Sequence, residues 1–297
     1  MHQNAHEPPA PILHQIPRRF VALGLVLVAV ILLAALVVLR DHNGGGASPA
    51  TETFTPAPAP LLDSLGHVPT AIIDSVGVTS PGRPITPLTH TGNPSLWQTT
   101  THGVSAVPVV FFYGAEFTPY AAAERWPLTM ALMRFGAFGQ LGLSQSNSSV
   151  VFSSISGFTF WHSTYTSAWL DLQTVERYST LNPTGTRFSS LQRPTARQAA
   201  SIAAYDTSAS TFPLLDIADR YVLVGSAFTP ALLVGQSQSQ IAADLTYPTS
   251  PVTEAIVTGA NEITAAICTV TGQRPATVCS TRGVMAADQK MKITPQY

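Results

Sequence analysis

Two stretches of the chain carry apolar residues without polar interruption, and they differ in length. The first, residues 20–39, holds twenty apolar residues and no charge. As a helix it would extend about 30 Å, enough to cross the hydrocarbon core of a bilayer. The second, residues 109–113, is a short run of β-branched and aromatic side chains. Because its polarity does not alternate, this run favours a central strand that is covered on both faces.

The residues after this strand carry the signals of a helix start. Thr118 offers a capping hydroxyl and Pro119 suits the first helical position, so a helix is predicted to begin at Pro119. Its end is predicted at 134–136, where a cation would face the negative end of the helix dipole and Gly136 could take the left-handed conformation. Pro127 lies inside this helix and predicts a kink, because it removes one backbone hydrogen bond.

Weaker patterns predict the other elements and give an α/β fold class. Helices are predicted at 195–205, 237–245 and 252–270, strand-like segments at 150–153, 159–161 and 171–178, and a hairpin from 211–217 and 221–225. A short helix or strand is expected at 68–73, followed by an irregular lead-in, and a Gly- and Ser-containing loop is expected over 136–149.

The 20–39 segment divides the chain into a short tail, an anchor, a linker and one large domain. Arg18 and Arg19 precede the segment and only Arg40 follows it, so the positive-inside rule puts the N-terminus in the cytoplasm. The predicted parts are a cytoplasmic tail (1–19), a transmembrane helix (20–39), a Gly/Pro/Ala-rich linker (40–60) and an extracytoplasmic domain (61–297). Cleavage of the N-terminal segment near residues 47–50 remains the alternative to a retained anchor.

Charge is sparse and excludes one class of partner. Charged residues make up 10% of the chain, with 15 Lys and Arg against 16 Asp and Glu. Three of the basic residues and one of the acidic residues precede Asp41, so the remainder carries 12 against 15, a balance of −3. This leaves no basic surface for nucleic acid. The surface of the large domain must instead consist largely of Ser, Thr, Gln and Ala.

Searches for catalytic and metal-binding motifs return little. The sequence lacks a Gly-x-Ser-x-Gly elbow, a phosphate-binding loop and a His-Glu-x-x-His motif. Cys268 and Cys279 have no nearby histidine that would complete a zinc site, whereas an oxidising compartment would allow them to form a structural pair. Glu124 and Arg125 are expected to be salt-bridge partners, at the surface or between subdomains. We expect no cofactor and no metal.

The segment GAEFTPYAAAERWPLTMALMRFG, residues 114–136, resembles a family of membrane-anchored, extracytoplasmic prokaryotic proteins. That family is catalogued as a domain of unknown function with a thioredoxin-like fold, and its members usually carry Cys-Pro-Tyr-Cys where this chain has Thr118, Pro119, Tyr120 and Ala121. The resemblance covers roughly residues 68–279. It implies a C-terminal cysteine pair at Cys268 and Cys279.

The resemblance also locates a groove, although the redox chemistry is lost. In thioredoxin-like proteins a cis-proline faces the Cys-x-x-Cys segment, which implies a cis bond before Pro213. Thiol–disulfide exchange needs a thiolate attacker, and neither threonine nor alanine supplies one. No catalytic residue is therefore predicted. The candidate groove residues are Phe117, Thr118, Pro119, Tyr120, Ala121, Phe212 and Pro213.

Three hypotheses for function follow from this reading. The first is a non-catalytic scaffold or binding protein, in which the backbone before the cis-proline pairs with an extended peptide or protein partner. The second is a thiol–disulfide oxidoreductase that uses Cys268 and Cys279 as an exposed, reducible pair. The third is a structural domain without a ligand.

Overall fold

The computed structural model describes residues 53–79, 85–87, 96–100, 106–147, 152, 154–180, 188–205 and 212–293. The predicted tail, the predicted transmembrane helix and part of the predicted linker lie outside these residues. Within the described ranges, no helix has both the length and the apolar character needed to span a membrane.

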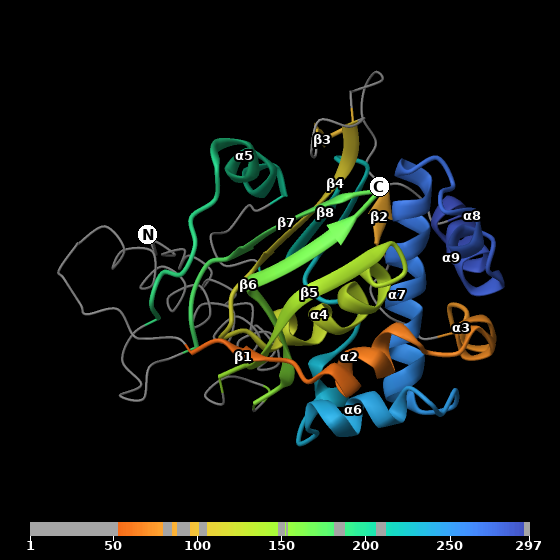
Figure 1. The fold of residues 1–297 in the computed structure, drawn as a ribbon, viewed down its shortest axis with the longest axis horizontal. Helices are drawn as coiled ribbons and strands as arrows, with labels where there is room; N and C mark the ends of the chain where they lie inside the picture. Colours follow the sequence, from red (N-terminus) through yellow and green to blue (C-terminus); the bar gives the residue numbers. More distant parts are fainter. Residues whose placement is uncertain are drawn as a thin grey trace, which may run out of the picture. The chain divides into compact units, whose positions relative to one another are not determined.

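The architecture is a mixed α/β arrangement around β4 (Ala106–Gly114) (Figure 1). The strand order in the larger sheet is β2 (Thr86–Pro87), β9 (Tyr221–Val224), β8 (Leu214–Ile217), β4 and β3 (Gln98–Thr100). β7 (Asp171–Glu176) also pairs with β4. It runs parallel to β4 over residues 109–114, whereas β8 pairs antiparallel on the other edge. The chain therefore forms a parallel strand–helix–strand unit and then an antiparallel hairpin, β8–β9, as predicted for 211–225.

β4 is the covered central strand that its composition predicts. Val109, Val110, Phe111 and Phe112 have no exposed surface. One face of the strand packs against the main hydrophobic core through Val110 and Phe112. The other face packs Val109 and Phe111 against Trp97 and Val175, next to Ile202 of α5 (Ala196–Tyr205). Burial on both faces explains why the strand shows no polar alternation.

Three strands form a second sheet in the order β1 (Thr55–Pro56), β5 (Gly136–Gln145) and β6 (Ser156–Ser167). The loop predicted over 136–149 is therefore wrong for most of its length, because its Gly and Ser residues lie in β5. β5 pairs antiparallel with β6 and its register shifts twice, between Phe138 and Gln140 and between Gln140 and Gly142. Such bulges accommodate a glycine-rich strand that would otherwise pair poorly.

The helix after β4 begins where predicted but ends earlier. α4 runs Pro119–Leu132, with Met133 as its C-cap. Gly136 is the first residue of β5 and does not serve as a left-handed stop. Arg134, predicted to sit over the helix dipole, instead donates from its Nη1 to Asn261 and Thr264 at 3.0 and 2.9 Å. Arg134 leaves the helix end because its hydrogen-bond partners lie on another helix, α7 (Pro251–Val270).

The remaining helices cover the sheet and each other (Figure 1). Their bounds are α2 (Ala59–Gly66), α3 (Thr70–Val76), a 3₁₀ turn η1 (Pro230–Leu233), α6 (Gln238–Asp244), α7 (Pro251–Val270), α8 (Ala276–Cys279) and α9 (Arg282–Ile293). α7 packs against α4 on one side and α9 on another, and nearly all of its residues are buried. α9, which the sequence reading did not anticipate, covers the flank of α7 that would otherwise face solvent.

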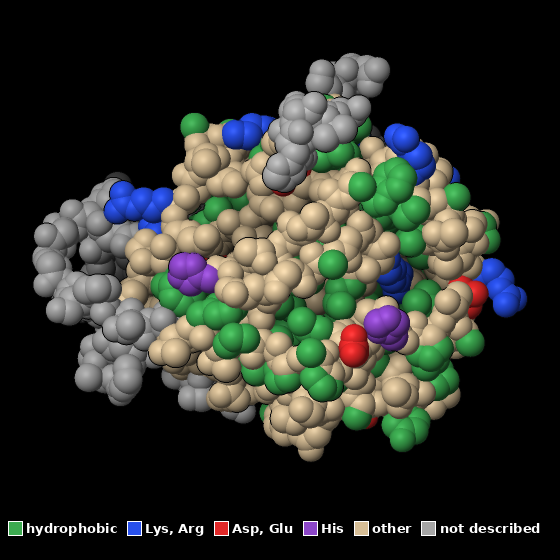
Figure 2. All heavy atoms as spheres, in the orientation of Figure 1, with side chains coloured by type: hydrophobic (Ala, Val, Ile, Leu, Met, Phe, Trp, Pro, Cys, Tyr) green, Lys and Arg blue, Asp and Glu red, His purple; other side chains and the backbone are tan. Residues whose placement is uncertain are grey.

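The surface of the described part carries few charges. Figure 2 shows one face of the molecule, where Lys, Arg, Asp and Glu side chains appear singly among polar and apolar atoms. The large exposed hydrophobic side chains of the described residues are Tyr120, Val234, Tyr247 and Met285.

Candidate functional site

The junction between β4 and α4 places the Thr118–Ala121 segment at a helix N-terminus. The Thr118 hydroxyl accepts a hydrogen bond from the Ala121 backbone amide at 3.0 Å, so Thr118 is the N-cap as predicted. Thr118 is 8% exposed and Ala121 has no exposed surface. The hydroxyl is therefore committed to holding the helix, and alanine has no heteroatom for redox chemistry.

Five aromatic side chains gather beside this segment and are called here the aromatic cluster. They are Tyr113, Phe117, Tyr178, Phe188 and Phe212. The Phe117 ring stacks on Phe188 with centroids 3.9 Å apart, and it meets Phe212 edge-to-face at 6.1 Å. Phe212 also lies 4.9 Å from Tyr113. The cluster thus joins the residue before the Thr118–Ala121 segment to the residue before Pro213.

The structure brings most of the predicted groove residues together, but Tyr120 lies apart from the aromatic cluster. The peptide bond between Phe212 and Pro213 is cis, and Pro213 is buried. Tyr120 is 44% exposed, and its ring meets Phe152 at 6.0 Å, which lies outside the aromatic cluster. No hydrogen bond links the Phe212 backbone to another described residue.

Beneath the junction lies a buried ion cluster of Arg125, Glu176 and Glu116. Arg125 binds Glu176 through two nitrogens, at 3.0 Å from Nε and 2.5 Å from Nη2, and its Nη2 lies 3.5 Å from Glu116. Arg125 and Glu176 have no exposed surface, and Glu116 is 2% exposed. Of the two placements expected for the Arg125 ion pair, the surface one is therefore wrong, and the role of Arg125 in an ion pair is confirmed. Arg125 lies in the interior because α4 is covered by both the β5–β6 sheet and α7.

The charges of this cluster depend on one another. Burial lowers the pKa of Arg125, but Glu116 and Glu176 together raise it above its ordinary value. Burial raises the pKa of Glu176 to about 7, and the Arg125 guanidinium opposes that rise. Two carboxylates against one guanidinium leave the cluster short of positive charge, which explains why the further partners of the carboxylates are donors such as the Thr159 hydroxyl and the Phe160 amide.

Glu124, next to Arg125, is a second buried carboxyl but has a different environment. One of its oxygens accepts from the Ala227 amide at 2.7 Å, and the other has no hydrogen-bond partner among the described residues. Burial, and secondarily the nearby Glu262, raises the pKa of Glu124 to about 8. Glu124 is therefore protonated at neutral pH, so it is not the salt-bridge partner, at the surface or between subdomains, that the sequence predicts.

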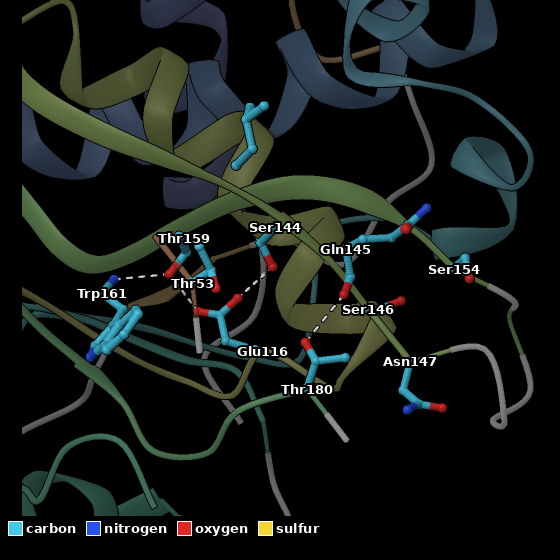
Figure 3. A pocket seen from close by; sticks show the side chains of 11 residues that line it. Thr53, Glu116, Ser144, Gln145, Ser146, Asn147, Ser154, Thr159, Trp161 and Thr180 are labelled. Atoms are coloured by element: carbon cyan, nitrogen blue, oxygen red, sulfur yellow. Dashed lines mark hydrogen bonds between the residues drawn. The ribbon is translucent and has the colours of Figure 1, made fainter. Parts of the chain in front are cut away.

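An open polar pocket of about 390 Å³ lies next to the ion cluster (Figure 3). Glu116 points into it from the β4–α4 junction, and the ends of β5 and β6 supply Ser144, Gln145 and Thr159. Sequence reasoning missed this pocket because it assigned most of β5 to a loop. No spacing pattern indicates it, since Glu116 and Thr159 are 43 positions apart.

The two cysteines form a disulfide, as the resemblance implied. Their Cα atoms are 5.7 Å apart, and they link the last turn of α7 to α8. Cys268 is 1% exposed and Cys279 is 6% exposed. This burial does not fit the exposed, reducible pair that the enzyme hypothesis requires.

Residues 101–188 match a family model described as a domain of unknown function (DUF929). The matched segment contains the Thr118–Ala121 segment, Arg125, Glu176 and most of the polar pocket, and it ends before Phe212 and both cysteines. A match was found neither among curated proteins nor among solved structures. The expected relation to a domain-of-unknown-function family is therefore supported for this segment.

Proposed function

We propose that this chain is a membrane-anchored, extracytoplasmic protein with a thioredoxin-like domain, and that the domain binds an extended peptide or protein segment without catalysing a reaction. The observation that carries the proposal is the aromatic cluster, which joins Phe117 to Phe212 beside a cis-proline. In thioredoxin-like proteins this is where the substrate chain passes the dithiol. Here the binding surface is kept and the two sulfur atoms are replaced.

The thioredoxin-like part of the proposal is supported by the order of elements. β4 and α4 come first, the parallel strand β7 follows after the inserted strands β5 and β6, and a hairpin entered through Pro213 and followed by helices comes later. The peptide-binding part is supported by two features of the groove. The Phe212 backbone has no hydrogen bond to other described residues, so an extended segment could pair with it. Tyr120 adds an exposed aromatic surface nearby in sequence.

Peptide binding is tested with the full-length protein and a phage-displayed random peptide library. Selected peptides should bind wild type, and Tyr120→Ala should weaken them about tenfold by removing an exposed aromatic contact. Tyr247→Ala is the matched control, because Tyr247 is 63% exposed and lies outside the groove. Methylating one peptide nitrogen at a time should abolish binding at the position that pairs with Phe212. If selected peptides bind Tyr120→Ala and wild type equally, Tyr120 is not part of the binding surface, and if peptide methylation also has no effect at any position, the groove is not the binding site.

The thioredoxin-like geometry is tested by restoring the sulfur atoms with Thr118→Cys and Ala121→Cys. The Thr118 side chain already reaches the Ala121 amide at 3.0 Å, so the two thiols should lie close enough to form a disulfide. Wild type should reduce no disulfide in an insulin-reduction assay, and the double variant should show activity. A double variant that folds but forms no 118–121 disulfide would contradict the proposed fold.

The competing enzyme hypothesis makes a distinct prediction. If Cys268 and Cys279 acted as a redox pair, mild reductant without denaturant should expose two alkylatable thiols. Because both are buried, we expect alkylation only after unfolding.

The proposed membrane orientation is tested separately: protease added to intact cells should remove the 61–297 portion, and protection of that portion would reverse the orientation.

A further inference from the structure

The polar pocket is separate from the proposed peptide groove. None of its lining residues belongs to the aromatic cluster, although both sites use the β4–α4 junction. Glu116 faces the pocket, while the next residue, Phe117, stacks in the aromatic cluster. A ligand in the pocket therefore would not need the residues that the peptide proposal uses.

The floor of the pocket is held rigidly. Glu116 accepts hydrogen bonds from the hydroxyls of Ser144 and Thr159, and the Arg125 guanidinium fixes it from behind at 3.5 Å. Thr159 in turn accepts from the Trp161 backbone amide at 3.0 Å (Figure 3). Because these bonds hold both Glu116 oxygens, the floor is preorganised, and its carboxylate is stabilised by two hydroxyl donors and the shared guanidinium.

The chemistry of the lining selects a neutral ligand. Among the described residues that line the pocket there is no Lys, Arg or His, and Glu116 is the one carboxylate. An anion would meet a carboxylate with no exposed cation, and a cation would compete with the Ser144 and Thr159 hydroxyls that already donate to the two Glu116 oxygens. The walls carry amides and hydroxyls, including Gln145, Asn147 and Thr180, which both donate and accept.

One wall of the pocket is aromatic, and this restricts the class of ligand further. Trp161 is half-buried at the edge of the pocket, and its ring lies 4.1 Å from the His162 ring. The face of an aromatic ring is electron-rich and attracts the C–H groups on one side of a sugar ring, while the hydroxyls of the sugar match the polar walls. The pocket volume of about 390 Å³ lies in the lower part of the range for small-molecule sites. We propose that this pocket binds a neutral polyhydroxylated molecule of the size of a mono- or disaccharide.

The test uses saturation-transfer NMR on the full-length protein in a detergent without a sugar headgroup. The probes are glucose, galactose, mannose, N-acetylglucosamine and maltose, with ethanolamine as a cationic probe. At least one sugar should receive saturation, mainly on its ring C–H protons. Saturation of ethanolamine but of none of the sugars would overturn the neutral class, and saturation of no probe would overturn the site.

Matched variants locate the site. Trp161→Ala should raise the dissociation constant of the responding sugar about tenfold, whereas Trp161→Phe should retain much of the affinity. Gln145→Ala is a second variant at an exposed position, so its effect does not depend on a core change. The controls are Tyr247→Ala and Gln289→Ala, both exposed and outside the pocket lining. If the sugar signal is the same in Trp161→Ala and Gln145→Ala as in wild type, the sugar binds elsewhere and the proposal fails.

Discussion

Two buried regions fix the helices of this domain, and they use opposite kinds of chemistry. Beneath α4, Arg125 joins Glu176 and Glu116 by charge, across 51 positions of sequence. At the end of α7, Cys268 joins Cys279 by a covalent bond across eleven positions. The first region ties three segments into one core beside the Thr118–Ala121 segment. The second closes a local loop far from it in sequence.

The two regions respond differently to pH. A disulfide holds two residues whatever their protonation states, whereas an ion cluster holds its members only while the charges match. The Arg125–Glu176–Glu116 cluster lies beneath the β4–α4 junction, and the sulfur atoms lie at the C-terminal helices. The Thr118–Ala121 segment is therefore supported by buried charge and packing, without a covalent bond.

The largest expected effect comes from removing the centre of the ion cluster. Arg125→Met leaves Glu176 and Glu116 buried without their counter-charge, so the free energy of unfolding at pH 7 should fall by about 3–5 kcal/mol. Urea denaturation of wild type and variant measures this. The loss should be smaller at pH 5, because the raised pKa of Glu176 lets that carboxyl take up a proton.

Arg197→Met is the matched control for this effect. Arg197 pairs with Asp219, but its side chain is 47% exposed, so solvent screens the pair. Its removal should cost roughly 0.2–1 kcal/mol. Equal losses for Arg125→Met and Arg197→Met would show that the buried cluster contributes no more than a surface pair.

The next effect concerns the protonated carboxyl beside the cluster. The pKa of Glu124 rises from 4.5 to about 8 in the folded protein, so between these values the native state holds a proton that the unfolded chain has released. Glu124 alone should therefore make the free energy of unfolding fall with rising pH in this window, by about 1.4 kcal/mol per pH unit. Glu124→Gln mimics the protonated form and should remove this part of the slope, whereas the part that comes from the raised pKa of Glu176 should remain. Denaturation series at pH 5, 6, 7 and 8 decide the matter, and an unchanged slope in the variant would contradict the assignment.

The covalent region should contribute less. Replacing both cysteines, Cys268→Ala with Cys279→Ala, removes the closure of a loop of eleven positions, and the chain-entropy relation gives a loss of about 2–3 kcal/mol. Unlike the loss in Arg125→Met, this loss should be the same at pH 5 and pH 7. A loss that varies strongly with pH would mean that the disulfide and the ion cluster are coupled.

Local sequence signals predict the start of α4, the β8–β9 hairpin and α7, but not the buried ion cluster. Thr118 and Pro119 start α4 because a capping hydroxyl and a proline act within one turn, and such signals survive any tertiary context. The hairpin at β8–β9 and helix α7 were likewise predictable from their patterns. The disulfide could be predicted because the chain has two cysteines and the family resemblance implies that they pair.

The ion cluster and the pocket could not be predicted because their members share no local pattern. Glu176 looks like an ordinary strand end, and its role depends on β7 running parallel to β4. Gly136 and the glycines after it resemble a loop, and they form a strand only because β6 pairs with them through two register shifts. The polar pocket lies at the end of that misassigned strand, so the error in β5 concealed the site as well.

The smallest expected effect isolates the one local contact at the junction. Thr118→Ala removes the hydroxyl that accepts from the Ala121 amide, and the free energy of unfolding should fall by about 1 kcal/mol. Thr118→Ser keeps the hydroxyl and should stay close to wild type. The cap lies between the aromatic cluster and the buried charges. A small loss of unfolding free energy in Thr118→Ala would therefore show that the candidate groove is held mainly by the ion cluster beneath it. A loss for Thr118→Ala as large as that for Arg125→Met would reverse this order and make the start of α4, and not the buried charges, the main support of the site.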